Sequence, residues 1–140
     1  MTTTKPLYVC GFLFDEATEN IVLLKRNKPP SQAGLYNGLG GKVEPNERPI
    51  DTMQREFKEE SGVYIENWIE FACLEQAEGI SYFFYAKSDI LLDVYSAEEQ
   101  EVRAFKINDA LNHLPLMPNL KWLILMCLDE NVCYVTIQSK

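Results

Sequence analysis

Glu56, Glu59 and Glu60 form an acidic cluster near the end of one predicted helix. Like charges three or four residues apart on a helix repel each other by ~0.2–0.5 kcal/mol per pair. The helix dipole also disfavours anions near a helix C-terminus, by ~0.3–1 kcal/mol each. Because the cluster is unfavourable by itself, we expect it to bind something positive. Carboxylate oxygens suit the hard cations Mg²⁺ and Mn²⁺ better than zinc.

Arg55 and Glu47 are placed to support these carboxylates. Arg55 precedes Glu59 by four residues, so on a helix we expect it to hold that carboxylate by a charge-assisted hydrogen bond. Glu47 comes from the loop that leads into the helix. Because Mg²⁺ typically takes one or two protein carboxylates and completes its shell with water and substrate phosphates, the cluster predicts a phosphate-containing substrate.

Two other phosphate- or metal-binding motifs are excluded. The segment GLYNGLGGKV looks superficially like a P-loop, but Tyr36 stands where that motif needs glycine and Val43 where it needs a hydroxyl. The EF-hand pattern D-x-[DN]-x-[DN]-G does not occur. An acidic helix that merely faces solvent is the other alternative, and the spacing of the whole segment argues against it.

The residues from Gly41 to Val63 resemble a Nudix box in full. They read G-x5-E-x7-R-E-U-x-E-E-x-G-U, where U is an apolar residue. Seven fixed identities, at a background of roughly 5–7% each, give on the order of one chance match in 10⁸ windows. The one mild departure is Phe57, where an aliphatic residue is commoner. Outside the box, the order of predicted strands and helices also resembles the Nudix fold.

This resemblance implies an α/β fold, a Nudix-type α/β/α sandwich with a mixed sheet, that hydrolyses a nucleoside diphosphate linked to another group X. It implies Mg²⁺ or Mn²⁺ as cofactor and a nucleotide as substrate. The implied metal ligands are three carboxylates, one of which also helps to deprotonate water, and one backbone carbonyl: Glu56, Glu59, Glu60 and Gly40. Arg55 and Glu47 would orient the ligands, and Lys42 would contact phosphate or hold its loop.

A further glutamate is expected from a loop beyond the box. The segment YSAEEQEVRAF offers Glu98, Glu99 and Glu101. We favour Glu98, because E-x-x-E-V-R resembles the corresponding segment of MutT-like triphosphatases.

The segment GLYNGLGGKVEPNE resembles the one that leads into the box in enzymes that hydrolyse oxidised purine nucleoside triphosphates. This resemblance implies that Asn37 touches the base and that Asn119, after Leu-Met-Pro, lies on the purine edge. Three apolar side chains are predicted to line a slot for the ring, with ordinary packing as the equal alternative: Tyr36, Phe83 and Met117. Asn119 has a second interpretation, as the N-cap of the helix that follows it.

Hydrophobic patterning and turn residues predict the elements that position these side chains. The predicted strands are 7–14, 20–26, 64–76, 79–87, 101–107 and 131–138. The predicted helices are 49–60, 108–114 and 118–130, the last apolar on nearly every side and therefore expected to be buried against a sheet. Gly62 fits the C′ position of the first helix. Together they predict a mixed sheet with helices on both faces.

The whole chain of 140 residues is predicted to form a single domain, 1–140, because 46% of it is apolar. The sequence shows neither an apolar run of 18 residues nor a signal-peptide pattern. A net charge of −8 argues against nucleic acid or an anionic membrane as partners, and the oligomeric state stays open.

The cysteine and histidine content is typical of a cytoplasmic protein without a thiol or histidine active site. The four cysteines form no C-x-x-C pair and are predicted to be reduced and buried: Cys10, Cys73, Cys127 and Cys133. The single histidine, His113, is predicted to lie on the surface near a helix end, and no G-x-S-x-G motif accompanies it.

Three functions remain open. The first is a divalent-metal-dependent pyrophosphatase that converts a nucleoside triphosphate, with a purine or an oxidised purine such as 8-oxoguanine, to the monophosphate and pyrophosphate. The second is hydrolysis of a dinucleotide or sugar nucleotide such as ADP-ribose. The third is a non-catalytic nucleotide-binding module, which the complete set of box carboxylates disfavours.

Overall fold

The computed structural model describes residues 5–138. Its strands are β1 (Leu7–Phe14), β2 (Asn20–Lys25), β3 (Tyr36–Asn37), β4 (Leu39–Lys42), β5 (Ile69–Gln76), β6 (Gly79–Lys87), β7 (Glu101–Lys106) and β8 (Val135–Gln138). Its helices are α1 (Pro49–Ser61), α2 (Ile107–His113) and α3 (Leu120–Leu128), with short 3₁₀ helices η1 (Pro30–Gln32) and η2 (Asp89–Asp93).

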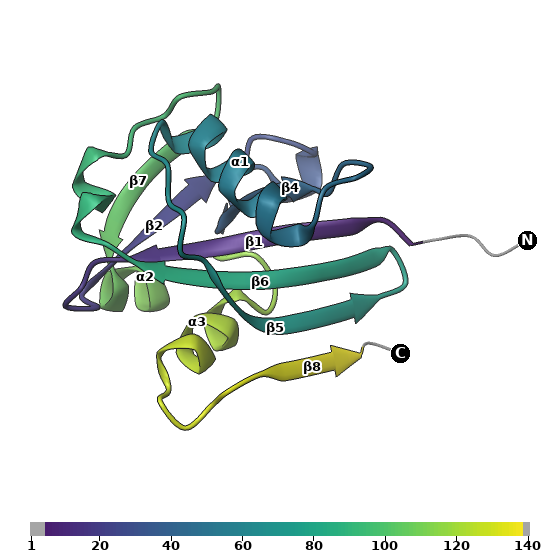
Figure 1. The fold of residues 1–140 in the computed structure, drawn as a ribbon. Helices are drawn as coiled ribbons and strands as arrows, with labels where there is room; N and C mark the ends of the chain where they lie inside the picture. Colours follow the sequence, from purple (N-terminus) through teal and green to yellow (C-terminus); the bar gives the residue numbers. More distant parts are fainter. Residues whose placement is uncertain (1–4, 139–140) are drawn as a thin grey trace, which may run out of the picture.

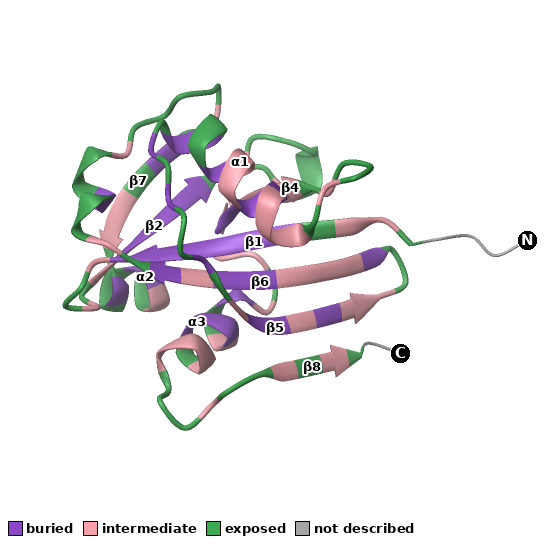
Figure 2. Cartoon of the chain, in the orientation of Figure 1, coloured by how far each residue is buried: buried purple, intermediate pink, exposed green. Residues whose placement is uncertain are grey.

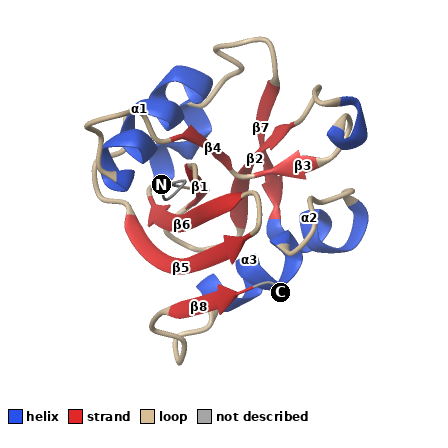
Figure 3. Ribbon diagram, turned by 90° about the vertical axis from the view of Figure 1, so that its right-hand side faces the viewer, coloured by secondary structure: helices blue, strands red, loops and turns tan. Residues whose placement is uncertain are grey.

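The strands described form a mixed sheet with β1 near its centre (Figures 1 and 3). The main path runs β3-β2-β1-β6-β5-β8, while β4 pairs with β1 and β7 pairs with β2. The β1–β6 and β5–β8 pairs are parallel and the other pairs are antiparallel. The β1–β2 pair is antiparallel, with Leu13 opposite Val22.

Helices cover both faces of this sheet, as predicted (Figure 1). Successive side chains of a strand point to opposite faces. On β1, Val9 and Leu13 belong to the apolar cluster under α1, whereas Phe12 and Phe14 belong to the cluster beneath α2 and α3. Because both of its faces are buried, β1 is apolar almost throughout, and it is largely purple in Figure 2.

Helix α1 begins and ends within one residue of its prediction. Pro49 occupies the first turn, where a missing N–H is harmless. Met53 and Phe57 are fully buried on its inner side. The helix ends at Gly62, whose φ of 77° is the left-handed conformation that glycine adopts without strain.

Three predicted elements are shorter than the sequence suggested. The strand expected over 64–76 begins only at Ile69, because the preceding segment instead packs Ile65 and Trp68 into the core beside α1. The strand expected over 131–138 begins at Val135. Helix α3 covers only residues 120–128; it is buried against the sheet as predicted, through Leu120, Leu123 and Ile124, while its outer side is open, with Leu125 49% exposed.

The cysteine prediction is confirmed only in part. Cys10 is buried, but Cys73 on β5 and Cys127 near the end of α3 are partly exposed, and Cys133 in the segment before β8 is exposed. All four thiols are free. His113 is exposed at the end of α2, as predicted. None of the helices described has the length and apolar character needed to cross a membrane.

Gly62 gives a stability prediction. A Cβ at this position would lie 2.1 Å from the Tyr95 ring, and its φ is positive, so Gly62→Ala adds a clash to backbone strain. Gly34 is the matched control, because its φ is +89° but nothing lies within 4 Å of the place that a Cβ would take. We expect Gly34→Ala to lower the free energy of unfolding in urea by about 1–2 kcal/mol, and Gly62→Ala by more.

The exposed Tyr95 separates the two effects. In a Tyr95→Ala background, the loss caused by Gly62→Ala should fall to that of Gly34→Ala, because only backbone strain then remains. Equal losses for the two glycine substitutions in the wild-type background would show that the ring yields without cost.

Candidate active site on helix α1

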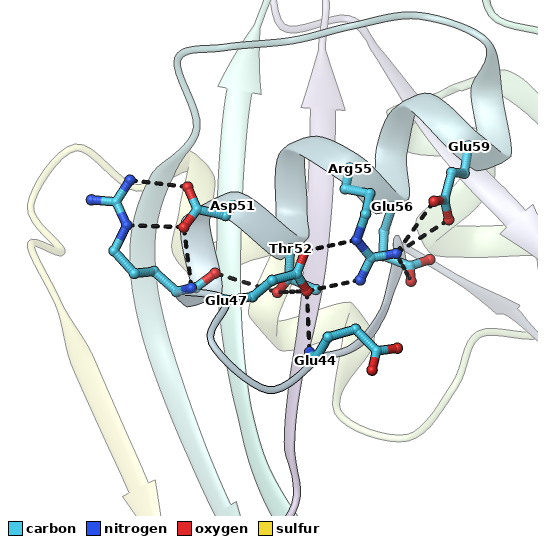
Figure 4. Close-up of polar contacts among 8 residues, drawn as sticks. Glu44, Glu47, Asp51, Thr52, Arg55, Glu56 and Glu59 are labelled. Carbon is cyan, nitrogen blue, oxygen red and sulfur yellow. Dashed lines mark hydrogen bonds and ion pairs between the residues drawn. The ribbon is translucent and has the colours of Figure 1, made fainter.

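Arg55 is the centre of an ion-pair network on the exposed side of α1 (Figure 4). Its Nε and Nη2 donate to the two carboxylate oxygens of Glu47 at 2.7 and 2.9 Å, a bidentate pair. Its Nη1 donates to Glu56 Oε1 at 2.9 Å. The predicted contact with Glu59 is present but longer, at 3.3 Å to the nearer oxygen. One guanidinium therefore orients three carboxylates.

Glu47 is fixed from every side. Besides Arg55, its Oε1 accepts hydrogen bonds from the Thr52 hydroxyl at 2.9 Å and the Glu44 N–H at 3.1 Å. The Arg55 hydrogen bonds lower the pKa of Glu47 to about 2, so this carboxylate stays ionised. Glu47 therefore connects the loop before α1 to the helix, and its carboxylate serves a structural role.

Glu60 is the buried member of the acidic cluster, only 7% exposed. Its Oε1 accepts a hydrogen bond from the Gly40 N–H of β4 at 2.9 Å. Burial raises the pKa of Glu60 to about 8, and the charge of Glu56 adds to this rise. Burial likewise raises the pKa of Glu56, against the opposing hydrogen bond from Arg55. Glu56 and Glu60 thus interact in an environment that disfavours the ionised form of both carboxyl groups.

Gly40 and Gly41 allow this close approach of β4 to its neighbours. A Cβ on Gly40 would lie 1.9 Å from the Val9 carbonyl oxygen of β1. A Cβ on Gly41 would lie 2.6 Å from the Glu56 carboxyl carbon. The first glycine of the box therefore leaves the space that the Glu56 carboxylate occupies.

Of the three glutamates beyond the box, the structure places Glu98 beside the cluster. Its charge contributes to the raised pKa of both Glu56 and Glu60. Glu99 instead pairs with Lys28 at 3.4 Å, and Glu101 with Arg103 at 3.5 Å. The Glu98 loop is fastened to the end of α1, where the Ala97 N–H donates to the Glu60 carbonyl at 3.1 Å.

The acidic cluster suits a hard divalent cation completed by other ligands. Across residues 5–138, no three His, Cys, Asp or Glu side chains by themselves form a closed metal-binding group. Arg55 holds Glu56 and Glu59 at the margin, while Glu60 is buried with a raised pKa, and a cation would relieve the repulsion. A cation that takes few protein carboxylates and several water or phosphate ligands fits this arrangement.

A cavity of about 360 Å³ opens next to the cluster. Glu60, Gly40 and Gly41 lie at one part of its wall. Four of the five predicted substrate-binding residues also line it: Asn37, Phe83, Met117 and Asn119. Tyr36 does not, and the prediction that it lines the slot is wrong: its ring packs edge-on against Phe105 at 5.3 Å, in the rim of the core. Lys42 is exposed at the end of β4, outside the lining.

Sequence reasoning missed Arg26, which also lines the cavity. Its Nε is buried and has no hydrogen-bond partner within the described part of the chain. Its charge lies close enough to lower the pKa of Glu60. The only sequence feature that could have pointed to Arg26 is its position as a basic residue at the end of an apolar strand. Basic residues at solvent-exposed strand ends show the same pattern, so it does not identify a cavity residue.

Asn119 does not cap α3 with its side chain, so the capping interpretation is wrong. No side-chain capping hydrogen bond is formed, and the residue has a φ of 73°. Asparagine tolerates this left-handed conformation better than most residues. Its Oδ1 instead accepts a hydrogen bond from Trp122 Nε1 at 3.3 Å.

Comparison with known proteins places the chain in a family. The family model of the NUDIX domain matches residues 4–124. The chain belongs to the Nudix family. It is therefore a hydrolase that acts on a pyrophosphate bond of a nucleoside diphosphate linked to another group, and Nudix hydrolases generally use divalent metal ions. No curated protein matches the chain in a sequence search.

Solved Nudix structures share the fold at low sequence identity. A MutT structure from work on Aliivibrio salmonicida and Vibrio cholerae has a TM-score of 0.75 at 24% identity, covering 87% of this chain and 95% of that one. A Nudix hydrolase from Nitrosomonas europaea has a TM-score of 0.75 at 21% identity, covering 99% and 82%. MutT from Bacillus halodurans has a TM-score of 0.73 at 20% identity, covering 96% and 90%.

The buried carboxyl of Glu60 gives a pH prediction for the metal-free protein. Because its folded-state pKa of about 8 lies above the ordinary 4.5, ionisation of Glu60 destabilises the fold. The penalty is absent below about pH 4.5 and complete above about pH 8. In EDTA, the melting temperature of Glu60→Gln should therefore be close to that of the wild type at pH 5. As the pH rises to 8, it should exceed the wild-type value by a growing margin.

Glutamine keeps an oxygen for the Gly40 N–H, so the comparison isolates the charge. Glu66→Gln, at an exposed site outside the cluster, controls for the substitution. A Glu60→Gln curve parallel to the wild-type curve across this pH range would contradict the assignment of a buried, destabilising charge.

Proposed function

We propose that this Nudix protein hydrolyses a purine nucleoside triphosphate, including an oxidised purine such as 8-oxo-dGTP, to the nucleoside monophosphate and pyrophosphate. The observation that carries the proposal is the shared wall of the cavity. Glu60 and Gly40 lie in the same cavity as Asn37 and Asn119. A cavity that contains both a carboxylate for cation binding and amides that can hydrogen-bond a nucleobase suits a ligand with phosphates at one end and a heterocycle at the other.

The proposed cation-binding groups are the carboxylates and the carbonyl on and around the end of α1: Glu56, Glu59, Glu60, Glu98 and the Gly40 carbonyl. Mg²⁺ or Mn²⁺, when bound, neutralises charge on the phosphate oxygens and activates water for attack on phosphorus. Arg55, held by Glu47, keeps the neighbouring carboxylates in place through its ion pairs. One of the glutamates accepts the proton of the attacking water.

Two basic groups supplement this site in the proposal. Arg26 lines the cavity with a guanidinium whose buried Nε has no partner in the described chain, although its Nη2 donates to the Lys28 carbonyl at 3.0 Å, and such a group suits an anionic part of the substrate. Lys42 at the end of β4 would contact phosphate or steady its loop. Free nucleotide rather than nucleic acid is the proposed ligand, because a chain with a net charge of −8 repels a long polyanion.

The products of the reaction provide the first test. A triphosphate substrate should yield the monophosphate and pyrophosphate in a divalent-dependent reaction. We expect an alkaline optimum, because the proposed site contains carboxylates and no histidine near it to act as a base at neutral pH. Phosphate and pyrophosphate release across a panel of nucleotides, with ADP-ribose included, measures this.

Orthophosphate as the first product, or full activity in excess EDTA, would contradict the proposal. A clear preference for ADP-ribose over every triphosphate would favour hydrolysis of a sugar nucleotide or dinucleotide instead.

The carboxylates themselves provide the second test. Glu56→Gln, Glu59→Gln and Glu60→Gln should each lower kcat at saturating Mg²⁺ by about 10²-fold or more, since each removes one charge of the proposed cation site while keeping side-chain size. Circular dichroism should stay unchanged. Glu66→Gln, exposed and outside the cluster, should retain wild-type kcat. Near-wild-type kcat in any of the three variants would remove that residue from the proposed ligand set.

A further inference from the structure

Arg26 and Gln100 lie at the same end of two paired strands. Strands β2 and β7 are antiparallel neighbours, with Lys25 opposite Glu101 (Figure 3). Arg26 and Gln100 are the next residues along the two chains. Both line a second cavity, of about 350 Å³. Side chains at opposed positions of an antiparallel pair are close enough to interact, so we expect contact between these two.

Each of these two side chains has one buried polar atom without a hydrogen-bond partner in the described part of the chain. The atoms are Arg26 Nε and Gln100 Oε1. The first can only donate and the second can only accept. Buried polar groups are normally paired, because an unpaired one destabilises the fold. A small rotation of either side chain, or one water molecule between them, would satisfy both atoms at once.

The carboxylates that line the second cavity already have cationic partners. Glu99 pairs with Lys28 at 3.4 Å, and Glu101 pairs with Arg103 at 3.5 Å. The amide oxygen of Gln100 therefore competes for the guanidinium only with acceptors that are engaged elsewhere.

The segment that carries Gln100 is held at both ends. At its start, the Ala97 N–H donates to the Glu60 carbonyl of α1 at 3.1 Å. At its end, the Val102 N–H of β7 donates to Ser96 Oγ at 2.8 Å. These bonds fix the place of Gln100 relative to α1 and β7.

Arg26 belongs to both cavities. It lines the second cavity and also the 360 Å³ cavity that Glu60 lines. Its charge lowers the pKa of Glu60, so the guanidinium lies near the acidic cluster. Its Nη2 donates to the Lys28 carbonyl at 3.0 Å. A second contact, at Nε, would fix the plane of the guanidinium as well as its position.

We propose that Gln100 is a positioning residue for Arg26: its amide oxygen receives the Arg26 Nε–H and holds the guanidinium at the wall of the substrate cavity. The inference rests on the proposed function, in which Arg26 contacts an anionic part of the substrate. Gln100 follows Glu98 by two residues. One loop thus brings a carboxylate to the proposed cation site and orients a cation toward the substrate.

The first experiment observes the contact without substrate. In ¹⁵N-resolved NMR spectra, Arg26→Lys identifies the Arg26 Nε–H signal by its loss. Gln100→Met keeps the side-chain length and removes the acceptor, so exchange of this hydrogen with water should become about tenfold faster or more. Gln138→Met makes the same chemical change at an exposed position of β8 and should leave the exchange rate unchanged.

The second experiment measures the effect on catalysis. Gln100→Met should raise KM for the preferred triphosphate by about three- to tenfold with kcat nearly unchanged, because a contact made equally in the ground and transition states is weakened. Gln100→Glu keeps an acceptor and should retain a KM close to that of the wild type. In an Arg26→Met background, Gln100→Met should have no further effect, since its partner is already gone.

The outcomes separate this inference from the proposed function. If triphosphates are hydrolysed, an unchanged KM in Gln100→Met, or an equal rise in KM with and without Arg26, would overturn the inference alone. If no triphosphate is hydrolysed, the proposed function fails and the exchange measurement still decides the contact. An exchange rate in Gln100→Met equal to that of the wild type would overturn it.

Discussion

The bidentate ion pair between Arg55 and Glu47 is the interaction on which the site depends. It is partly buried, it keeps Glu47 ionised, and it leaves one guanidinium nitrogen free to hold Glu56 and Glu59. A bidentate pair fixes the plane of the guanidinium as well as its position, which a lysine ammonium would not do. The loop before α1 and the acidic residues of the helix are thereby held as one unit.

This arrangement concentrates negative charge where the fold disfavours it, and the rest of the chain compensates. Glu60 is buried beside Glu56, and the pKa of both carboxyl groups is raised because burial and the neighbouring negative charges disfavour ionisation. Apolar clusters on both faces of the sheet supply the opposing stability, with β1 contributing side chains to each. A cation at the site would relieve the repulsion, so folding and cation binding favour the same geometry. Strain of this kind is typical of functional sites.

Local sequence determined the parts of the structure that depend on local rules. The first turn at Pro49, the buried stripe and the terminal glycine specify α1 closely, and the box spacing brings Glu47 to Arg55. Long-range packing decided the rest. Tyr36 turned to Phe105 and away from the cavity, a contact between distant parts of the chain that no local pattern contains.

The end of α1 explains why acidic groups distant in sequence lie together. The last carbonyls of a helix have no partner within it, so they must find donors elsewhere. Here the Tyr95 and Ala97 N–H groups donate to the carbonyls of Ser61 and Glu60, at 3.0 and 3.1 Å. The segment can come this close because Gly62 has no side chain. The helix that supplies the box glutamates therefore also positions the loop of Glu98, through its backbone. The box glycine thus does two things: it ends the helix, and it leaves room for the loop that brings Glu98 to the cluster.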